Sequence, residues 1–259
     1  AIPRRDHSTS TVYDKYEHNI SSSNTTNSGA TNLFDSTFYF RTSANRVYKV
    51  LDNGSNGTMS AEPTAEDAGI ITQDNYKLLY MYTITAAEQQ AFLTTDFMPV
   101  STDSTVSARA TDGKIEDTVI IVAGGTGGTD GTHTDVDIRG DGTGGKATVV
   151  ISSNTVSSVT VTTAGSGYTF ATISDADINT AGGGSLSGSN LNVIIGPKGG
   201  HGSNAVDELG GHYVMLQSSL EGADSDDFLT ANDFREISLL VDPTEFGTST
   251  VASATTLRN

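Results

Sequence analysis

The sequence predicts a mainly β protein, built from antiparallel sheets or a β-sandwich with one or two short helices, plus a Gly/Thr-rich repeated β domain. Three observations support this fold class. Short runs of aromatic and β-branched residues alternate with Gly, Asn and Asp turns, which is typical of antiparallel strands. One segment carries a clear helix-capping signature. From residue 114 onward the chain becomes rich in Gly and Thr, and part of it repeats.

The first 32 residues are polar and irregular. Residues 19–30 consist almost entirely of Asn, Ser, Thr and Gly, so they offer little apolar surface to bury and predict a loop. We expect ordered structure to begin at Phe34.

Three segments that follow predict strands. Residues 37–41 and 46–51 are rich in aromatic and β-branched side chains, and the second run ends in Asp-Asn-Gly at 52–54, a strong turn signal. Residues 76–84 are apolar on both faces, as expected for a strand in the centre of a sheet.

Helices are expected at two places. Thr85 and Glu88 form a capping box, which predicts a helix of about three turns immediately after it. A second, short helix is predicted over residues 205–209, with Ser203 or Asn204 as its N-cap.

An internal repeat covers residues 114–195. Ile115 aligns with Val156 without gaps over ten residues, an offset of 156 − 115 = 41. Three further matches follow it: 137–138 with 177–178, 140–145 with 182–184, and 147–151 with 191–195. Two such β units should pack face to face as a small sandwich. We therefore expect this repeat domain to interrupt a core domain formed by residues 1–113 and 196–259.

The last part of the chain changes character again. Residues 196–202 form a Gly-rich loop, and strands are predicted over 212–217 and 234–241 with an acidic loop at 221–227 between them. The tail beyond residue 246 is rich in Thr, Ser and Ala, and we expect it to be frayed.

Composition excludes several classes of protein. Fourteen Lys and Arg against 31 Asp and Glu give a formal charge of −17, which argues against binding to nucleic acid. Without cysteine there is no disulfide, thiolate nucleophile or zinc–thiolate site. No apolar run approaches the roughly 18 residues that a membrane helix needs, so no membrane partner is expected. No signal peptide is visible, and the missing initial Met suggests a fragment or a processed chain.

Sequence motifs that suggest chemistry have simpler interpretations. Residues 140–147 nearly spell a phosphate-binding loop, but strand-forming residues follow where a helix is required, so we expect a hairpin loop. Residues 135–141 resemble the start of a calcium loop, but Arg139 stands at a ligand position. His201 and His212 do not have zinc-ligand spacing. We therefore expect neither a catalytic centre nor a cofactor.

Three stretches together resemble a known family. They are residues 1–6 (Ala-Ile-Pro-Arg-Arg-Asp), residues 47–51 with 76–82, and residues 232–243 (Asn-Asp-Phe-Arg-Glu-Ile-Ser-Leu-Leu-Val-Asp-Pro). In this order and spacing they resemble the gene-product-8 family of baseplate wedge proteins from T-even-type contractile-tailed phages. The loop at 196–202 and the residues up to 215 are similar to phage relatives of that family. The resemblance covers about half of the chain; the segment that family members carry before the first motif is absent, and residues 114–195 do not match.

The resemblance implies a mainly β structural protein of the virion, located in the tail baseplate and assembled in the bacterial cytoplasm. Such proteins form homodimers, bind neighbouring wedge proteins and transmit the rearrangement that triggers sheath contraction. The chain is then not an enzyme. Candidate docking residues in the matched segments are Arg4, Arg5, Lys198, His201 and Arg235. An Arg in so acidic a chain can instead form an ion pair within the fold.

Two alternatives remain open. The repeat domain could be a tail-fibre or adhesin-like module that binds glycans. A secreted acidic hydrolase is the third possibility, because paired catalytic carboxylates leave no local signature in a sequence.

Overall fold

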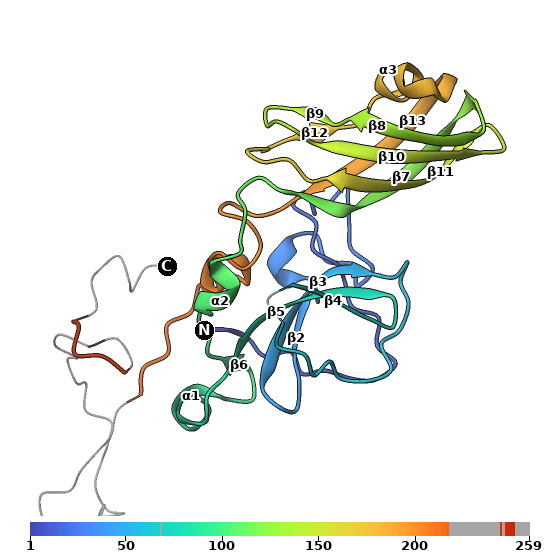
Figure 1. The fold of residues 1–259 in the computed structure, drawn as a ribbon. Coiled ribbons are helices and arrows are strands. Elements are labelled where there is room, and N and C mark those ends of the chain that lie inside the picture. Colours follow the sequence, from blue (N-terminus) through green and yellow to red (C-terminus); the bar gives the residue numbers. More distant parts are fainter. Residues whose placement is uncertain (68, 218–243, 245–246, 252–259) are drawn as a thin grey trace, which may run out of the picture.

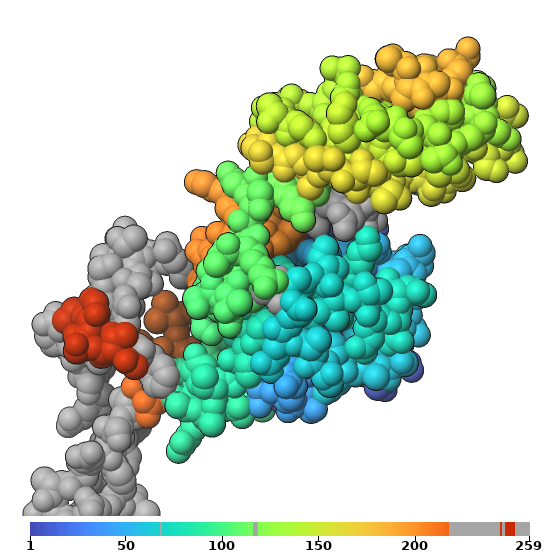
Figure 2. All heavy atoms as spheres, viewed as in Figure 1, coloured from blue at the N-terminus to red at the C-terminus, as the bar shows by residue number. Residues whose placement is uncertain are grey.

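A computed structural model describes residues 1–67, 69–217, 244 and 247–251. Its fold is mainly β with a few short helices, which confirms the predicted class. Two β bodies lie one above the other and are joined by short connections (Figure 1). The space-filling view shows the same two masses of atoms, with segments from around residues 110 and 200 between them (Figure 2).

The lower body contains a four-stranded antiparallel sheet in the order β2-β3-β5-β4. Its strands are β2 (Tyr39–Arg41), β3 (Arg46–Asn53), β4 (Ile70–Gln73) and β5 (Tyr76–Thr83). The sequence predicted β2, β3 and β5 but missed β4. As predicted, β5 lies between two other strands and is buried on both faces. Aromatic residues from β2, β3 and β5 fill much of the core around it.

The first 32 residues are more ordered than the sequence suggested. Ile2 lies in β1 (Ile2–Pro3), which pairs with β6 (Phe97–Met98), and Ile2, Tyr13 and Tyr16 are buried. The expectation that order begins at Phe34 was therefore wrong. Three buried residues in 32 form no strand or helix pattern, and contacts with distant parts of the chain, including the pairing of β1 with β6, anchor the segment. Residues 19–30 are irregular, as predicted.

The helices of the lower body are short. The capping box at Thr85 and Glu88 is present in full and begins α1 (Ala86–Phe92), which is shorter than the predicted three turns. Asn204 caps α4 (Ala205–Glu208), one of the two N-caps considered. The remaining elements, η1 (Leu33–Asp35) and α2 (Ser104–Ser107), are single turns capped by Asn32 and Asp103, and the sequence analysis did not predict them.

The upper body is built on a five-stranded antiparallel sheet in the order β13-β7-β11-β10-β8. Its strands are β7 (Ile115–Gly128), β8 (Gly131–Asp137), β10 (Lys146–Ser152), β11 (Thr155–Thr163) and β13 (Gly184–Ile195). A small ribbon joins β9 (Arg139–Gly140) to β12 (Ala171–Thr172). Beyond it lie α3 (Asp175–Ile178) and the turn η2 (Asn179–Gly183).

The two repeat units do not pack face to face, so that part of the prediction was wrong. Strand β7, from the first unit, lies between β11 and β13 of the second, and the units share one sheet. The match of 137–138 with 177–178 also fails, because the first pair ends a strand and the second lies in α3. Both edge strands, β8 and β13, contact α3 and η2, so the sheet curls around its core and this segment closes it (Figure 1).

The two bodies have separate hydrophobic cores with limited mixing. Every buried member of the upper core comes from residues 115–195. The lower core takes Ile194 from the upper segment and has Ile120 packed against it. The chain enters the upper body at Lys114 and leaves at Gly196, whose N–H donates to the Lys114 carbonyl at 3.0 Å. The entry and exit of the upper body are thus side by side.

The predicted strand over residues 212–217 does not form; this segment is irregular, and near its start the Tyr213 carbonyl accepts a hydrogen bond from the Ala1 amino group of the lower body. A strand requires a partner edge, and none of the described strands pairs with it. The predicted strand over 234–241 and the acidic loop over 221–227 lie outside the described residues, as does most of the tail beyond 246.

Candidate functional site

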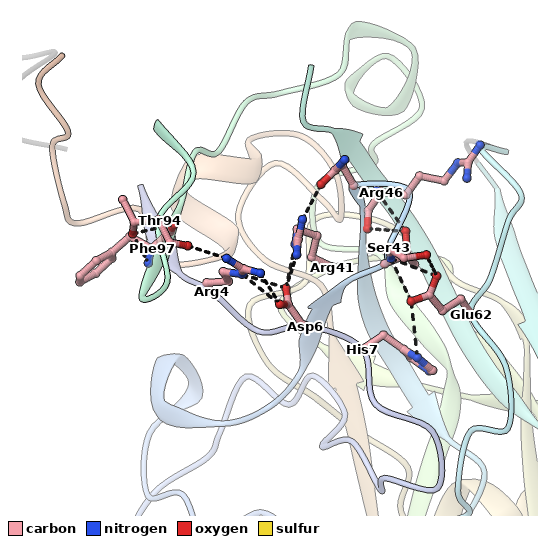
Figure 3. A network of polar contacts seen from close by, with 11 residues as sticks. Arg4, Asp6, His7, Arg41, Ser43, Arg46, Glu62, Thr94 and Phe97 are labelled. Atoms are coloured by element: carbon pink, nitrogen blue, oxygen red, sulfur yellow. Dashed lines mark hydrogen bonds and ion pairs between the residues drawn. The ribbon is translucent and has the colours of Figure 1, made fainter. Parts of the chain in front are cut away.

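Asp6 is the centre of an arginine network next to strands β1 and β2 (Figure 3). Arg4 donates to its carboxylate at 2.7–3.1 Å through Nε and Nη2, and Arg41 lies 2.7 Å from it on the other side. Arg4 also donates through Nη1 to the Thr94 carbonyl at 2.7 Å. The first motif of the chain therefore fixes its own turn and holds the segment before β6.

The electrostatics of Asp6 follow from these contacts. Partial burial alone would raise the pKa of its carboxyl group. Hydrogen bonds and charge from Arg4 and Arg41 outweigh burial and hold the pKa at about 2. Asp6 is consequently ionised throughout the physiological range, so its charge is available to both arginines.

Arg5 is also turned inward. Its guanidinium lies 4.5 Å from the centre of the Tyr39 ring, and its Nη2 donates to the Phe34 carbonyl at 2.9 Å. The other terminal nitrogen, Nη1, is buried without a hydrogen-bond partner among the described residues. In this conformation, Arg4 and Arg5 both make contacts within their own chain. Arg4 does so through the ion pair that the sequence analysis gave as the alternative to docking.

His7 completes the same segment. Its imidazole stacks on Tyr13 with a centroid distance of 5.8 Å and touches the Phe40 ring, and Nδ1 lies 4.0 Å from the Glu62 carboxylate. Burial lowers the pKa of His7, although the charge of Glu62 opposes this effect. Glu62 also accepts hydrogen bonds from the N–H and hydroxyl of Ser43, so it holds two loops together (Figure 3).

The Gly-rich loop 196–202 places its two candidate residues differently. Lys198 is exposed, as a docking residue must be. The His201 side chain is only 10% exposed, and its Nδ1 lies 2.7 Å from Lys49 Nζ. His201 therefore faces the interior of the lower body, where it also borders a cavity of about 350 Å³.

Lys49, Glu208 and Tyr16 form the rest of this buried cluster. The Lys49 ammonium is fully buried, lies 2.8 Å from the Glu208 carboxylate and 4.2 Å from the centre of the Tyr16 ring. Glu208 also accepts from the backbone N–H groups of Gly202 and Asn204. The cluster thus attaches the loop and α4 to β3.

Sequence reasoning did not identify Lys49 and Glu208. One signal was available, because Lys49 is a charged residue inside the otherwise apolar run 47–51 of a predicted strand. Its partner could not be found in this way, since 159 residues separate the two.

Two cavities border the connections between the bodies, and only the first takes residues from both bodies. One, of about 440 Å³, is bordered by Tyr16, His18, Tyr168 and the 195–198 segment that contains Lys198. The other, of about 350 Å³, lies against β4 and the residues after α2 and is mostly apolar. The sequence contained no local sign of either cavity, because their walls come from distant segments.

The remaining sequence motifs have structural partners. Residues after Gly145 form strand β10, as expected, so no helix begins where a phosphate-binding loop requires one. In the calcium-like stretch, Asp137 pairs with Lys146 at 2.5 Å and Arg139 pairs with Asp177 at 2.6 Å. Asp141 accepts hydrogen bonds from the N–H groups of Thr169 and Phe170.

His212 lies against the Phe34 ring. Within the described residues no group of three His, Asp or Glu side chains is arranged to hold a metal ion. Likewise, no described helix is long and apolar enough to cross a membrane. Arg235 lies outside the described residues.

Comparison with known proteins adds no relative: no family model, curated protein or solved structure matches this chain.

Proposed function

We propose that this protein is a structural component of a contractile phage tail, located in the baseplate wedge. In this role it binds neighbouring wedge proteins, forms a homodimer and transmits the rearrangement that triggers sheath contraction. It acts through its surfaces, without catalytic turnover and without a cofactor. It is assembled in the bacterial cytoplasm and resides in the virion.

The observation that carries this proposal is the resemblance of residues 1–6, 47–51 and 76–82 to the wedge family, combined with what these residues do here. They form one connected unit, in which β1, β3 and β5 share the lower core and the Arg4–Asp6–Arg41 network fixes the first motif. Motifs shared with one family are expected to meet in a single core when they encode a common body rather than isolated contacts.

The two-body architecture is consistent with the same role. The upper body projects from the lower one through two adjacent connections, so the chain offers separate surfaces to several neighbours (Figure 2). An assembly component requires such surfaces, whereas an enzyme requires a cleft with converging reactive groups.

Cross-linking mass spectrometry on purified virions tests this proposal. We expect cross-links to other baseplate proteins from the exposed Lys198 and the half-buried Lys15 and Lys77, and a dimeric mass in solution by light scattering. Virions that contain the protein but yield no such cross-links would refute the wedge assignment.

One observation favours the glycan-binding alternative. Phe170 is 59% exposed on the upper body, next to the Asp141–Thr169 hydrogen bonds, and an exposed ring beside polar groups is a common feature of binding sites. Retention on host surface polysaccharide that is lost in Phe170→Ala would support this alternative instead.

A further inference from the structure

The outer edge of strand β4 is open. Sheet order places β4 at an edge, next to β5 only. Asp74 and Asn75 both have positive φ, as in a two-residue type I′ turn, so Gln73 and Tyr76 form the hydrogen-bonded closing pair. Alternation then directs the N–H and C=O groups of Thr72 and Ile70 away from β5.

Nothing described in the chain uses these outward groups. No backbone hydrogen bond outside the sheets involves residues 70–73 among the described residues. Ile70 and Thr72 are both exposed, and Ile70 retains 40% of its accessible surface. An open edge strand of this kind is a template for a further strand.

The mostly apolar cavity of about 350 Å³ lies beside the first residue of β4. Ile70 forms part of its wall, Leu51, Leu79 and Val106 form its apolar lining, and Arg109 and Lys114 contribute two cations. Ile70 is directly opposite Leu79 in the sheet register, so both side chains lie on the same face. A residue paired with Ile70 on an added strand would share that face and point into the cavity.

The charges at this cavity determine what fits. Arg109 is 61% exposed and lies 3.6 Å from Asp67, itself 70% exposed, a surface pair of little stability that can exchange partners. In a chain with only 14 Lys and Arg, two cations at one apolar cavity are a local exception to the net charge of −17. A carboxylate next to an apolar side chain complements both features.

We propose that β4 and this cavity form a docking site for an extended, acidic segment of another polypeptide, which adds as a strand to β4. Main-chain hydrogen bonds to Ile70 and Thr72 supply affinity. One aliphatic side chain, opposite Ile70, enters the cavity, and a neighbouring carboxylate pairs with Arg109 or Lys114. The site stands independently of the wedge assignment, because an adhesin or an enzyme could carry it equally well.

An array of immobilised heptapeptides tests the site with the full chain. The peptides alternate Thr and Val, vary the central residue among Leu, Ile, Ala and Lys, and carry either Glu or Lys beside it. We expect retention for central Leu or Ile with Glu, and at least about tenfold weaker binding for Ala or Lys centres, or for Lys in place of Glu. The proposal is overturned if no peptide is retained, or if retention does not depend on the central residue.

Two variants at one position separate main-chain docking from side-chain contact. Thr72→Pro removes the outward N–H while leaving the inner pairing of β4 with β5 intact, and Thr72→Ala removes the same side chain but keeps the N–H. We expect Pro to weaken peptide binding at least about tenfold and Ala less than about twofold. Circular dichroism and thermal melting of both variants check that the fold is retained. Equal effects of Pro and Ala in folded protein would refute strand addition.

The same variants identify the occupant. Sedimentation of the full chain should give the same oligomeric mass for Thr72→Pro and Thr72→Ala. If only the Pro variant loses an oligomer, the strand comes from a second copy of this chain, and the assignment to a different polypeptide is wrong.

Discussion

At the scale of single residues, charged side chains near the N-terminus stabilise the chain's own fold. Arg4, Asp6 and Arg41 form one network, and Arg5 packs on Tyr39. The sequence indicated that these arginines were special but could not distinguish docking from internal pairing, since both use the same residues. The structure decides in favour of internal pairing, because Asp6 lies between Arg4 and Arg41 of β2 and contacts both guanidinium groups.

Replacing Asp6 tests this network. Asp6→Asn removes the charge that two guanidinium groups share, and we expect a loss of about 0.5–1 kcal/mol in the free energy of unfolding at pH 7, because the group is partly exposed. Asp96→Asn, at a nearby exposed carboxylate without an Arg partner in this network, should change stability less. Urea denaturation measures both variants.

The same substitution has a defined pH dependence. The pKa of Asp6 is about 2 in the folded protein, below the unfolded value of roughly 3.9. Its contribution is therefore fully present above about pH 4 and is lost as the pH falls toward 2. The stability difference between wild type and Asp6→Asn should shrink over that window, and a constant difference would contradict the assigned network.

The buried Lys49–Glu208 pair makes a second prediction. Lys49→Met leaves the Glu208 carboxylate buried without its cation and should cost about 3–5 kcal/mol, whereas Lys49→Met with Glu208→Leu should recover much of that loss. Thermal and urea unfolding of wild type, both single variants and the double variant give the coupling energy. Additive losses would show that the two charges do not stabilise one another.

At the scale of secondary-structure elements, the sequence indicates best those features that depend on residues close together in the chain. The capping box of α1 joins residues three positions apart, and the two-residue turn between β4 and β5 is equally local. Strand β4 itself was missed because only Ile70 and Ile71 carry a strong β signal, and pairing with β5 supplies the rest. The predicted strand over 212–217 failed for the converse reason, since its β-forming residues lack a partner strand among the described elements.

The capping box can be measured directly. Thr85→Ala removes the hydroxyl that accepts from the Glu88 N–H, and we expect a loss of about 1 kcal/mol. Glu88→Gln keeps a side-chain oxygen able to accept from the Thr85 N–H, so it should cost clearly less. Chemical denaturation of the two variants measures how much each hydrogen bond of the capping box stabilises the protein.

At the scale of the whole molecule, the upper body is an insertion with adjacent ends. Its buried core comes from residues 115–195 alone, and Lys114 and Gly196 are hydrogen-bonded to each other. The lower core nevertheless uses Ile194 and a contact from Ile120. The two bodies are therefore joined by a small shared surface as well as by the chain.

Deleting residues 115–195 tests this arrangement. A short Gly-Ser bridge between Lys114 and Gly196 should leave the lower body soluble and folded, with a lower melting temperature because the contacts of Ile194 and Ile120 are lost. Circular dichroism and a dispersed NMR spectrum report the outcome. Collapse of the whole chain would show that the two bodies fold as one unit.

The sequence by itself determined the mainly β class, the principal strands of the lower sheet and the cap of its main helix. These follow from composition, alternation and contacts between residues close in the chain. Only the tertiary structure decided how the repeat units interleave, why residues 1–32 are anchored, that His201 meets Lys49 and Glu208, and that β4 presents an open edge beside a cavity. Each of these depends on residues far apart in the chain, whose pairing is set by which apolar faces and charges can be buried together.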